Sequence, residues 1–408
     1  MPTWLQEVFL GYGDPAGATN LPNTPQTVDF RDTFLSWGHL VESFPDMVRL
    51  DGFLFKFVDV DEEQNIQPEA GTSPGSDPPY TISQKPLSPL PKPSKKRRRD
   101  HADGEPLQVG ALGVRTYRLP NMGPYPIDQP KMNSTRFTPT QIKAIRSGTN
   151  PGLTVIVGPP GTGKTEVATQ IISNIYHNYP TQRTLLIAHS NHALNQLFEK
   201  ITALGIDERH LLRLGHGEEG LNTDISYSKQ GRVESFMDNR ARLLAEVDRL
   251  AACMGAPGAH GDSCETAGYF FQVYVPPAWS IFEEAIAATG EPATAETIRD
   301  AYPFHGYFAN TPSPMFPDGI SGDQALEIAQ GGYRHIQRIF SELEDIRPFE
   351  LLRTPRDRQN YLLKKEARII AMTSTHAAMK VTNSLARMLL FLSSLFSSLP
   401  SFLFMYPT

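Results

Sequence analysis

The sequence is short of cysteine, of excess charge and of a targeting leader, and each shortage excludes a class of protein. Only Cys253 and Cys264 occur among 408 residues, too few for a disulfide scaffold or a cysteine-rich zinc site. We therefore expect two reduced thiols in a nuclear or cytosolic protein. The formal net charge is −6, so any nucleic-acid-binding surface must be local. The residues after Met1 lack a basic start followed by an apolar core, so no signal peptide is predicted.

The C-terminal stretch 381–408 is apolar but poorly suited to a membrane anchor. From Met388 it reads MLLFLSSLFSSLPSFLFMYPT, which is serine-rich, broken by Pro400, and only about the minimum length that spans a bilayer. We interpret it as an atypical or aberrant end of the chain, and membrane binding is not expected.

The N-terminal third divides into two regions of different composition. Residues 1–60 contain short apolar runs such as TVDFRDTFLSW and RLDGFLFKFVDV, which predict a β-rich accessory domain. Residues 61–115 are acidic and then rich in Pro and Ser, which predicts a disordered linker. Within it Lys95, Lys96, Arg97, Arg98 and Arg99 form an unbroken basic run. Such a run indicates nuclear import; a loose nucleic-acid contact and a merely solvated linker are the alternatives.

From residue 130 to 224 the pattern becomes α/β. Thr138, Pro139 and Gln141 predict a capped helix start. LTVIV at 153–157 and TLLIA at 184–188 are continuous apolar runs, typical of strands buried on both faces. Amphipathic helices are predicted after Lys164 and over NHALNQLFEKITALG. Strand–helix alternation with short links predicts a parallel sheet.

A helical insertion is predicted at 225–365. Long helices are expected at 231–253 and 323–350, with a loop-rich segment at 254–320 between them. ARIIAMTSTHAA then returns to the buried-strand pattern, so residues 366–380 are assigned to the α/β domain again.

Residues 158–165, GPPGTGKT, match the phosphate-binding pattern G-x-x-x-x-G-K-[ST] completely. Glycines let successive backbone N–H groups converge on phosphate oxygens, and the following helix N-terminus favours negative charge. Lys164 can reach the β- and γ-phosphates, and the Thr165 hydroxyl can ligate Mg²⁺; these two are the catalytic candidates. A plain glycine turn is the weaker alternative. The candidate nucleotide-binding residues are Gln141, Gly158, Pro159, Pro160, Gly161, Thr162, Gly163, Lys164 and Thr165.

Hydrolysis also requires an acidic residue that holds the metal and orients the attacking water. From Ala367 to Thr408 there is no Asp or Glu. We therefore expect that the chain alone binds ATP weakly and does not turn it over.

GPPGTGKT, with TQIKAI before it and AHSNHALNQL after it, resembles the first motor domain of superfamily 1 helicases. LFEKITALGIDERHLLRLGHGEE, CETAGYFF and KEARIIAMTSTHAA are similar to one branch, the Aquarius-like intron-binding spliceosomal RNA helicases. The resemblance covers about residues 1–380. It implies a RecA-like P-loop NTPase fold, a stalk-like helical insertion, ATP and Mg²⁺ as cofactors, and RNA-dependent work in the nucleus on pre-mRNA introns beside spliceosomal proteins.

The resemblance also assigns roles to single residues. Gln141 matches the glutamine that reads the adenine edge, although the capping box alone would account for it. Ser190 and Asn191 match a motif that touches the nucleic-acid backbone, and a helix N-cap is the alternative. Thr373 and Thr375 match a second such motif; a packed strand threonine is the alternative.

The chain departs from the family pattern in three ways. It begins after the family's helical-repeat domain, stops before the acidic motif, and lacks the second motor domain. We therefore expect a truncated product or fragmentary gene model, with a sheet short of strands. The leading hypothesis is an ATP-dependent RNA helicase of the splicing machinery. The alternatives are a non-catalytic nucleotide- or RNA-binding fragment and, more remotely, an unrelated P-loop ATPase or kinase.

Overall fold

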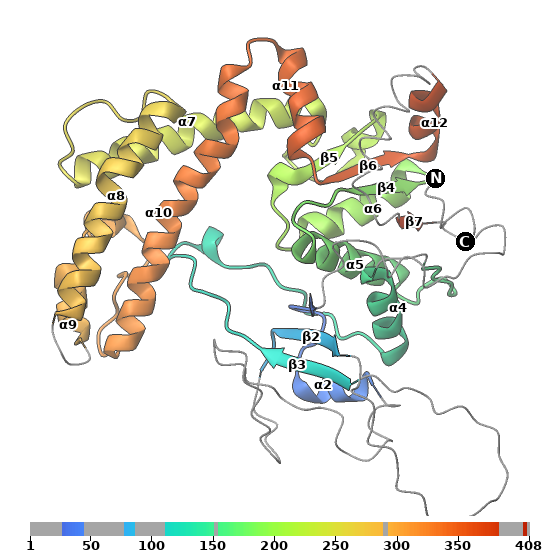
Figure 1. The fold of residues 1–408 in the computed structure, drawn as a ribbon. Coiled ribbons are helices and arrows are strands. Elements are labelled where there is room, and N and C mark those ends of the chain that lie inside the picture. Colours follow the sequence, from blue (N-terminus) through green and yellow to red (C-terminus); the bar gives the residue numbers. More distant parts are fainter. Residues whose placement is uncertain are drawn as a thin grey trace, which may run out of the picture.

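An antiparallel sheet, an α/β unit and a helical arm make up the fold (Figure 1). The computed structural model describes residues 27–44, 77–85, 111–150, 154–288, 293–382 and 403–405. Besides the longer elements given below it contains short helical turns: η2 (Pro126–Asp128), η3 (Glu208–His210), η4 (His216–Gly220), η5 (Tyr307–Asn310) and the π-turn η6 (Leu362–Glu366).

The N-terminal sheet consists of three antiparallel strands, β1 (Thr27–Asp29), β2 (Tyr80–Lys85) and β3 (Ala111–Thr116). Ile82 lies opposite Val114 in the β2–β3 register, and both are buried. The helix α2 (Trp37–Glu42), capped by Ser36, follows β1. β2 and nearly all of β3 fall within the span 61–115, so the prediction of a disordered linker is wrong for these strands. The basic run 95–99 and the apolar run 49–60 lie outside the described residues.

This sheet shares one hydrophobic core with the first two helices of the α/β unit, α4 (Pro139–Thr149) and α5 (Lys164–Asn178). Phe34 and Tyr80, almost fully buried, belong to the same cluster as Ile145 and Ile171. Because each such side chain contributes about 1.5–3 kcal/mol when it leaves water, the sheet and the α4–α5 layer stabilise each other.

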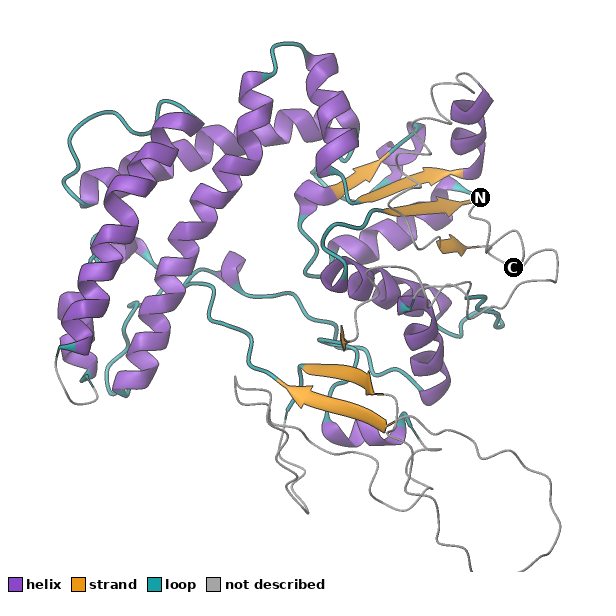
Figure 2. Ribbon diagram, in the orientation of Figure 1, coloured by secondary structure: helices purple, strands orange, loops and turns teal. Residues whose placement is uncertain are grey.

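The central sheet has the order β5-β6-β4-β7, and all of its neighbouring strands are parallel. Its strands are β4 (Thr184–Ala188), β5 (Leu211–Arg213), β6 (Ile369–Thr373) and the short β7 (Leu403–Met405). The helices α6 (Asn191–Thr202) and α12 (Ser374–Thr382) follow the carboxyl ends of β4 and β6. Leu186 and Ile369 pack with Phe198 of α6 in a second core. The predicted parallel α/β sheet is thereby confirmed (Figure 2).

The predicted buried strand at 153–157 is wrong. Residues 154–157 have no strand hydrogen bonding, and the side chains of Val155 and Val157 are 75% and 87% exposed. β4 pairs with β6 on one side and with β7 on the other. Residues 154–157 pair with none of the strands in the described part of the chain. An apolar run indicates that a segment can form a buried strand, but burial also requires a neighbouring strand to pair with it.

The helical arm is formed chiefly by α7 (Lys229–Cys253), α8 (Cys264–Ala287) and α10 (Gly322–Leu351), which lie away from the central sheet in Figure 1. The shorter α9 (Ala295–Ala301) and α11 (Pro355–Tyr361) complete it. Phe236 of α7 stacks on Phe349 of α10 with ring centroids 4.4 Å apart, and Trp279 of α8 stacks on Tyr333 of α10 at 4.3 Å. The core of the arm continues into the central sheet, because the same hydrophobic cluster includes Leu212 of β5 and Ile370 of β6.

The prediction of a loop-rich segment at 254–320 is wrong where α8 and α9 form. Ser263 and Thr266 make a capping box that starts α8, and Pro276 and Pro277 lie inside the helix rather than ending it. None of the helices in the described part of the chain is long and apolar enough to cross a bilayer. Apart from β7, residues 383–408 lie outside that part.

Candidate nucleotide and nucleic-acid sites

The phosphate-binding loop is shaped by its glycines. Gly161 and Gly163 adopt left-handed backbone angles, with φ of +81° and +75°, which glycine adopts without steric cost. A Cβ on Gly158 would lie 2.8 Å from the Thr162 hydroxyl oxygen, which itself donates to the Pro159 carbonyl at 2.9 Å. Pro159, Pro160, Gly161 and Thr162 are exposed. The loop is therefore open to a ligand.

The start of α5 has the features of a phosphate site. Gly163 is its N-cap and offers no side-chain capping bond, so the first backbone N–H groups of a 15-residue helix keep their capacity for an anion. The Lys164 ammonium donates to the Gly158 and Pro159 carbonyls at 2.6 and 2.9 Å. These are donors of the kind that a triphosphate requires: Lys164 lies over the loop, and Thr165 in the first helical turn carries the hydroxyl that would meet Mg²⁺.

Gln141 joins the start of α4 to the phosphate-binding loop. Its side-chain oxygen accepts from the Thr138 backbone N–H at 2.8 Å, which closes the capping box. Its Nε2 donates to the Thr162 carbonyl at 3.1 Å. The capping role is confirmed, and the contact with Thr162 places the residue beside the nucleotide loop. Recognition of adenine by Gln141 stays a prediction.

Ser190 and Asn191 lie where β4 passes into α6. The Ser190 hydroxyl caps α6 by accepting from the Ala193 N–H at 3.2 Å. The Asn191 Oδ1 accepts from Nη2 of Arg213 at 2.7 Å. Both residues are exposed, so the capping role leaves their outer faces open.

Thr373 and Thr375 lie at the corresponding turn from β6 into α12. The Thr373 hydroxyl accepts from the His376 N–H at 3.3 Å, and Thr375 is exposed. Because β4 and β6 are parallel neighbours with Ala188 opposite Thr373, their carboxyl ends lie at the same edge of the sheet. The structure therefore brings the two predicted nucleic-acid motifs together.

Sequence reasoning missed Arg213, the last residue of β5. It is 1% exposed and is the largest of the fully buried side chains. Its guanidinium donates to the side chains of Asn191 and Asn195 and to the Leu214 carbonyl. Burial lowers the pKa of Arg213, although a guanidinium stays protonated at neutral pH. A cation within the apolar run LLRLG was the signal that could have revealed it.

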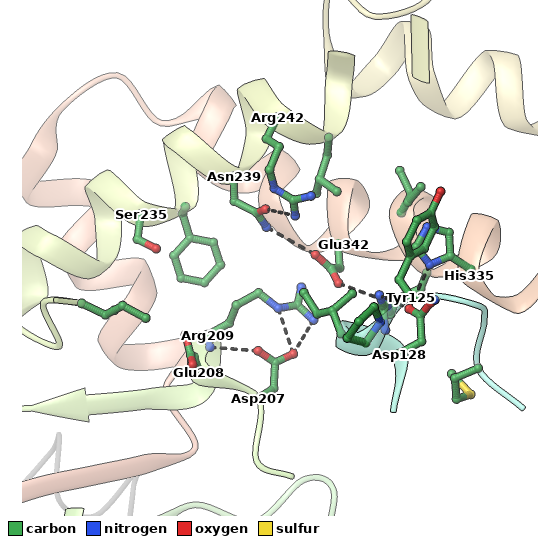
Figure 3. A pocket seen from close by; sticks show the side chains of 18 of the residues that line it. Tyr125, Asp128, Asp207, Glu208, Arg209, Ser235, Asn239, Arg242, His335 and Glu342 are labelled. Carbon is green, nitrogen blue, oxygen red and sulfur yellow. Dashed lines mark hydrogen bonds and ion pairs between the residues drawn. The ribbon is translucent and has the colours of Figure 1, made fainter. Parts of the chain in front are cut away.

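A cleft of about 1560 Å³ lies between the helical arm and the motor residues 204–209 (Figure 3). Ion pairs line it, among them Asp207 with Arg209 at 2.7 Å and Asp128 with Arg338 at 2.6 Å. Burial opposes the ionisation of Asp207, but the hydrogen bond and charge of Arg209 outweigh it and lower the pKa of this carboxyl. No residue of the phosphate-binding loop lines the cleft, so it is separate from the candidate nucleotide site.

A glycine-rich loop that opens a helix beside a parallel sheet defines a P-loop NTPase domain. The family model "AAA domain" matches residues 136–299, and the model "Intron-binding protein aquarius insert domain" matches residues 23–52 and 57–129. The chain belongs to the Aquarius-like proteins, as the resemblance predicted.

Comparison with curated proteins agrees. The chain is 50% identical to the RNA helicase aquarius of Mus musculus over 391 residues, which cover 93% of this chain and 25% of the mouse protein. It is 32% identical to the pre-mRNA-splicing factor cwf11 of Schizosaccharomyces pombe over 240 residues, covering 59% of this chain and 18% of that protein. A third relative, the DNA polymerase alpha-associated DNA helicase A of Saccharomyces cerevisiae, is 33% identical over 127 residues, covering 30% and 18%. The chain thus spans a quarter or less of the length of these relatives.

Proposed function

We propose that the chain binds ATP with Mg²⁺ at its phosphate-binding loop and RNA at the carboxyl edge of the central sheet, as the first motor domain of an ATP-dependent RNA helicase of pre-mRNA splicing. One observation carries the proposal: a complete phosphate-binding loop and two polar turns, at Ser190–Asn191 and Thr373–Thr375, belong to the same α/β unit. The names of the mouse and fission yeast relatives supply the substrate class and the process.

Nucleotide binding rests on the residues of the loop. The backbone N–H groups at the start of α5 and the Lys164 ammonium would hold the phosphates, and the Thr165 hydroxyl would hold the metal. Mg²⁺ supplies charge neutralisation at the phosphates when bound. The adjacent carboxylate, Glu166, forms an ion pair with Lys200 of α6, so it is engaged in joining the two helices.

RNA binding rests on the exposed donors of the two turns. Hydroxyl and amide groups at helix N-termini suit phosphate oxygens, and such backbone contacts are independent of base sequence. The expected partners are pre-mRNA introns and spliceosomal proteins, with work in the nucleus. The basic run 95–99 supports a nuclear location as an import signal.

The test is ATP binding and turnover by the purified 408-residue chain, with and without single-stranded RNA. Lys164→Ala is the loop variant, and Lys365→Ala, an exposed lysine on the π-turn, is the matched control. Loss of one charge-assisted contact to phosphate lowers ATP affinity by about tenfold or more for Lys164→Ala, whereas Lys365→Ala binds as the parent does. Equal ATP affinity in both variants would refute nucleotide binding at this loop.

The second candidate is a nucleotide- and RNA-binding protein without turnover. The absence of Asp and Glu from residues 367–408 favours it, because the metal-holding carboxylate of this class contributes orders of magnitude in rate. Turnover that Lys164→Ala abolishes supports the enzyme; binding without turnover supports the second candidate.

A further inference from the structure

We propose that Arg213 is a positioning residue, which fixes the Asn191 side chain and the Gly215–Gly217 turn in the conformation that contacts RNA. This inference rests on the proposed RNA-binding function of the β4–α6 and β6–α12 turns. It adds to that function a buried group that shapes the contact surface from beneath.

Arg213 is buried without an anionic partner. No ion pair among the described residues includes it, and the nearby Glu218 carboxylate accepts instead from Ser226, Tyr227 and Ser228. Its hydrogen bonds go to neutral oxygens alone, those of Asn191, Asn195 and Leu214. A buried cation without a counter-ion is costly, and here it is held by the exposed Asn191 and by the buried Asn195 and Leu214.

The guanidinium dictates which way Asn191 faces. A guanidinium carries donors only, so the asparagine beside it must present its oxygen, at 2.7 Å from Nη2. The amide Nδ2 of Asn191 is then directed away from Arg213 as a donor. Arginine therefore determines that this exposed turn offers a hydrogen-bond donor, the group that a phosphate oxygen needs.

The Nε atom of Arg213 connects the guanidinium to the Gly215–Gly217 turn through Asn195. Nε of Arg213 donates to Asn195 Oδ1 at 3.3 Å, and Asn195 Nδ2 donates to the Gly217 carbonyl at 2.7 Å. A Cβ on Gly217 would overlap both Asn191 Oδ1 and Arg213 Nη2. The glycine backbone thus packs directly on the Arg213–Asn191 pair, and glycine is the residue that permits it.

The same turn reaches the β6–α12 side. Gly215 has φ of +100°. A Cβ added to Gly215 would lie 3.3 Å from His376 Nδ1, so the two residues are close neighbours. His376 in turn donates its backbone N–H to Thr373. The guanidinium therefore contacts the turn after β4 directly and lies beneath the turn after β5, which in turn lies beside the β6–α12 turn at His376.

The experiment measures the affinity of the full chain for fluorescein-labelled oligouridine by anisotropy, with ATP-analogue affinity and thermal unfolding recorded for every variant. Arg213→Lys keeps the charge but loses the fork that holds two asparagines. Asn191→Ala removes the donor itself. Arg368→Lys is the matched control, because Arg368 also binds backbone carbonyls, those of Tyr176 and Tyr179, but lies just before β6 at the opposite edge of the sheet.

We expect Arg213→Lys to weaken RNA binding by about tenfold, the effect of one hydrogen bond to a charged group, with unchanged ATP-analogue affinity. The loss in the Arg213→Lys/Asn191→Ala double variant is smaller than the product of the two single losses, because both changes remove the Asn191 contact. Arg368→Lys keeps the RNA affinity of the parent. If Arg213→Lys does not fold, Gly217→Ala takes its place, since its Cβ would overlap both Asn191 Oδ1 and Arg213 Nη2 and so separate the pair while keeping both side chains.

Two results overturn the inference while leaving RNA binding in place. In one, folded Arg213→Lys binds RNA as the parent does although Asn191→Ala is impaired. In the other, the losses of the two single variants multiply in the double variant. If the proposed RNA-binding function is wrong, the result is different: the parent chain itself does not bind the labelled RNA.

Discussion

Asp32 and Gln170 are 138 residues apart in the sequence, yet Asp32 Oδ1 accepts a hydrogen bond from Gln170 Nε2 at 2.8 Å. Both side chains are buried. Oδ2 of Asp32 accepts from the Asn133 backbone N–H, and Gln170 Nε2 also donates to Thr33. Gln170 lies on α5, the helix that begins at the phosphate-binding loop. The N-terminal sheet region is thus fastened to that helix through buried polar groups as well as through the shared apolar core.

Asp32→Ala is expected to lower the free energy of unfolding by about 1–3 kcal/mol, because it leaves the half-buried Asn133 N–H without its acceptor and removes one acceptor of the buried Gln170 Nε2, which keeps Thr33. Chemical denaturation measures the effect. Glu42→Ala is the control: its ion pair with Arg136 is exposed on both sides, so it contributes at most about 1 kcal/mol. Equal losses in the two variants would contradict the structural role of Asp32.

Gly163→Ala and Gly161→Ala separate backbone strain from steric overlap in the phosphate-binding loop. Both glycines have positive φ, so alanine costs about 1–2 kcal/mol at either position. Only at Gly163 does the new Cβ meet a neighbour, Gln141 Nε2 at 2.8 Å, whereas nothing lies within 4 Å at Gly161. We expect about tenfold weaker ATP binding for Gly163→Ala and about threefold for Gly161→Ala.

The control for this pair is Gly255→Ala, which has φ of +65° and open space at the end of α7. Alanine at this position introduces the same backbone strain, but about 90 residues away from the phosphate-binding loop in the sequence. We therefore expect an unchanged ATP affinity in a labelled-nucleotide titration. A larger loss for Gly161→Ala than for Gly163→Ala would show that the contact with Gln141 is unimportant.

His210 makes stability depend on pH in the acidic range. Burial, the main cause, lowers the pKa of His210 from 6.5 to about 4, and its Nδ1 lies 2.6 Å from the Tyr176 hydroxyl. Because the folded state favours the neutral ring, the stabilisation is full above pH 6.5 and is lost as the pH falls from 6.5 toward 4. The loss is at most about 3 kcal/mol.

Denaturation at several pH values between 4 and 7 measures this slope. His210→Gln removes the titration, so its stability falls less steeply with acid than that of the parent. His177, whose pKa is also lowered to about 4, mainly by burial and also by Arg31, keeps its own share of the slope in that variant. An unchanged slope would exclude His210 as a contributor.

The two cysteines differ in reactivity. Cys264 is buried, and burial together with the Glu350 carboxylate raises the pKa of its thiol to about 12, whereas Cys253 is exposed. The thiolate is the reactive form, so Ellman's reagent should titrate one thiol in the native chain and two in denaturant. In Cys253→Ser no fast-reacting native thiol remains; a fast thiol in that variant would place Cys264 at the surface.

Local signals in the sequence predicted the elements that depend on neighbouring residues. The capping box of Thr138 and Gln141 marked the start of α4, and GPPGTGKT marked the turn into α5, because caps and glycine turns are encoded within a few residues. A parallel sheet was predicted from strand–helix alternation, although the pairing of β4 with β6, which frames both nucleic-acid turns, was not.

The elements that were missed depend on distant partners. Tyr80 of β2 is buried against α2 and α4–α5 residues, and nothing in its own Pro-rich surroundings shows this. The segment 254–320 was predicted to be loop-rich, yet α8 runs through Pro276 and Pro277, and Phe270 and Trp279 of this helix pack against α10. Arg213 escaped notice because its partners, Asn191 and Asn195, come from another strand–helix turn.

Val155 and Val157 expose alternate side chains just before the phosphate-binding loop. Between them Ile156 packs against the core that α4 and α5 share with the N-terminal sheet, and the Thr154 hydroxyl bonds to that of Ser147 on α4. The segment that leads into the loop is therefore held from the side of α4, while its valine face is open. A polypeptide surface that covers the two valines more tightly in the nucleotide-bound state would strengthen nucleotide binding. By thermodynamic linkage the bound nucleotide would strengthen the docking of that surface by the same factor.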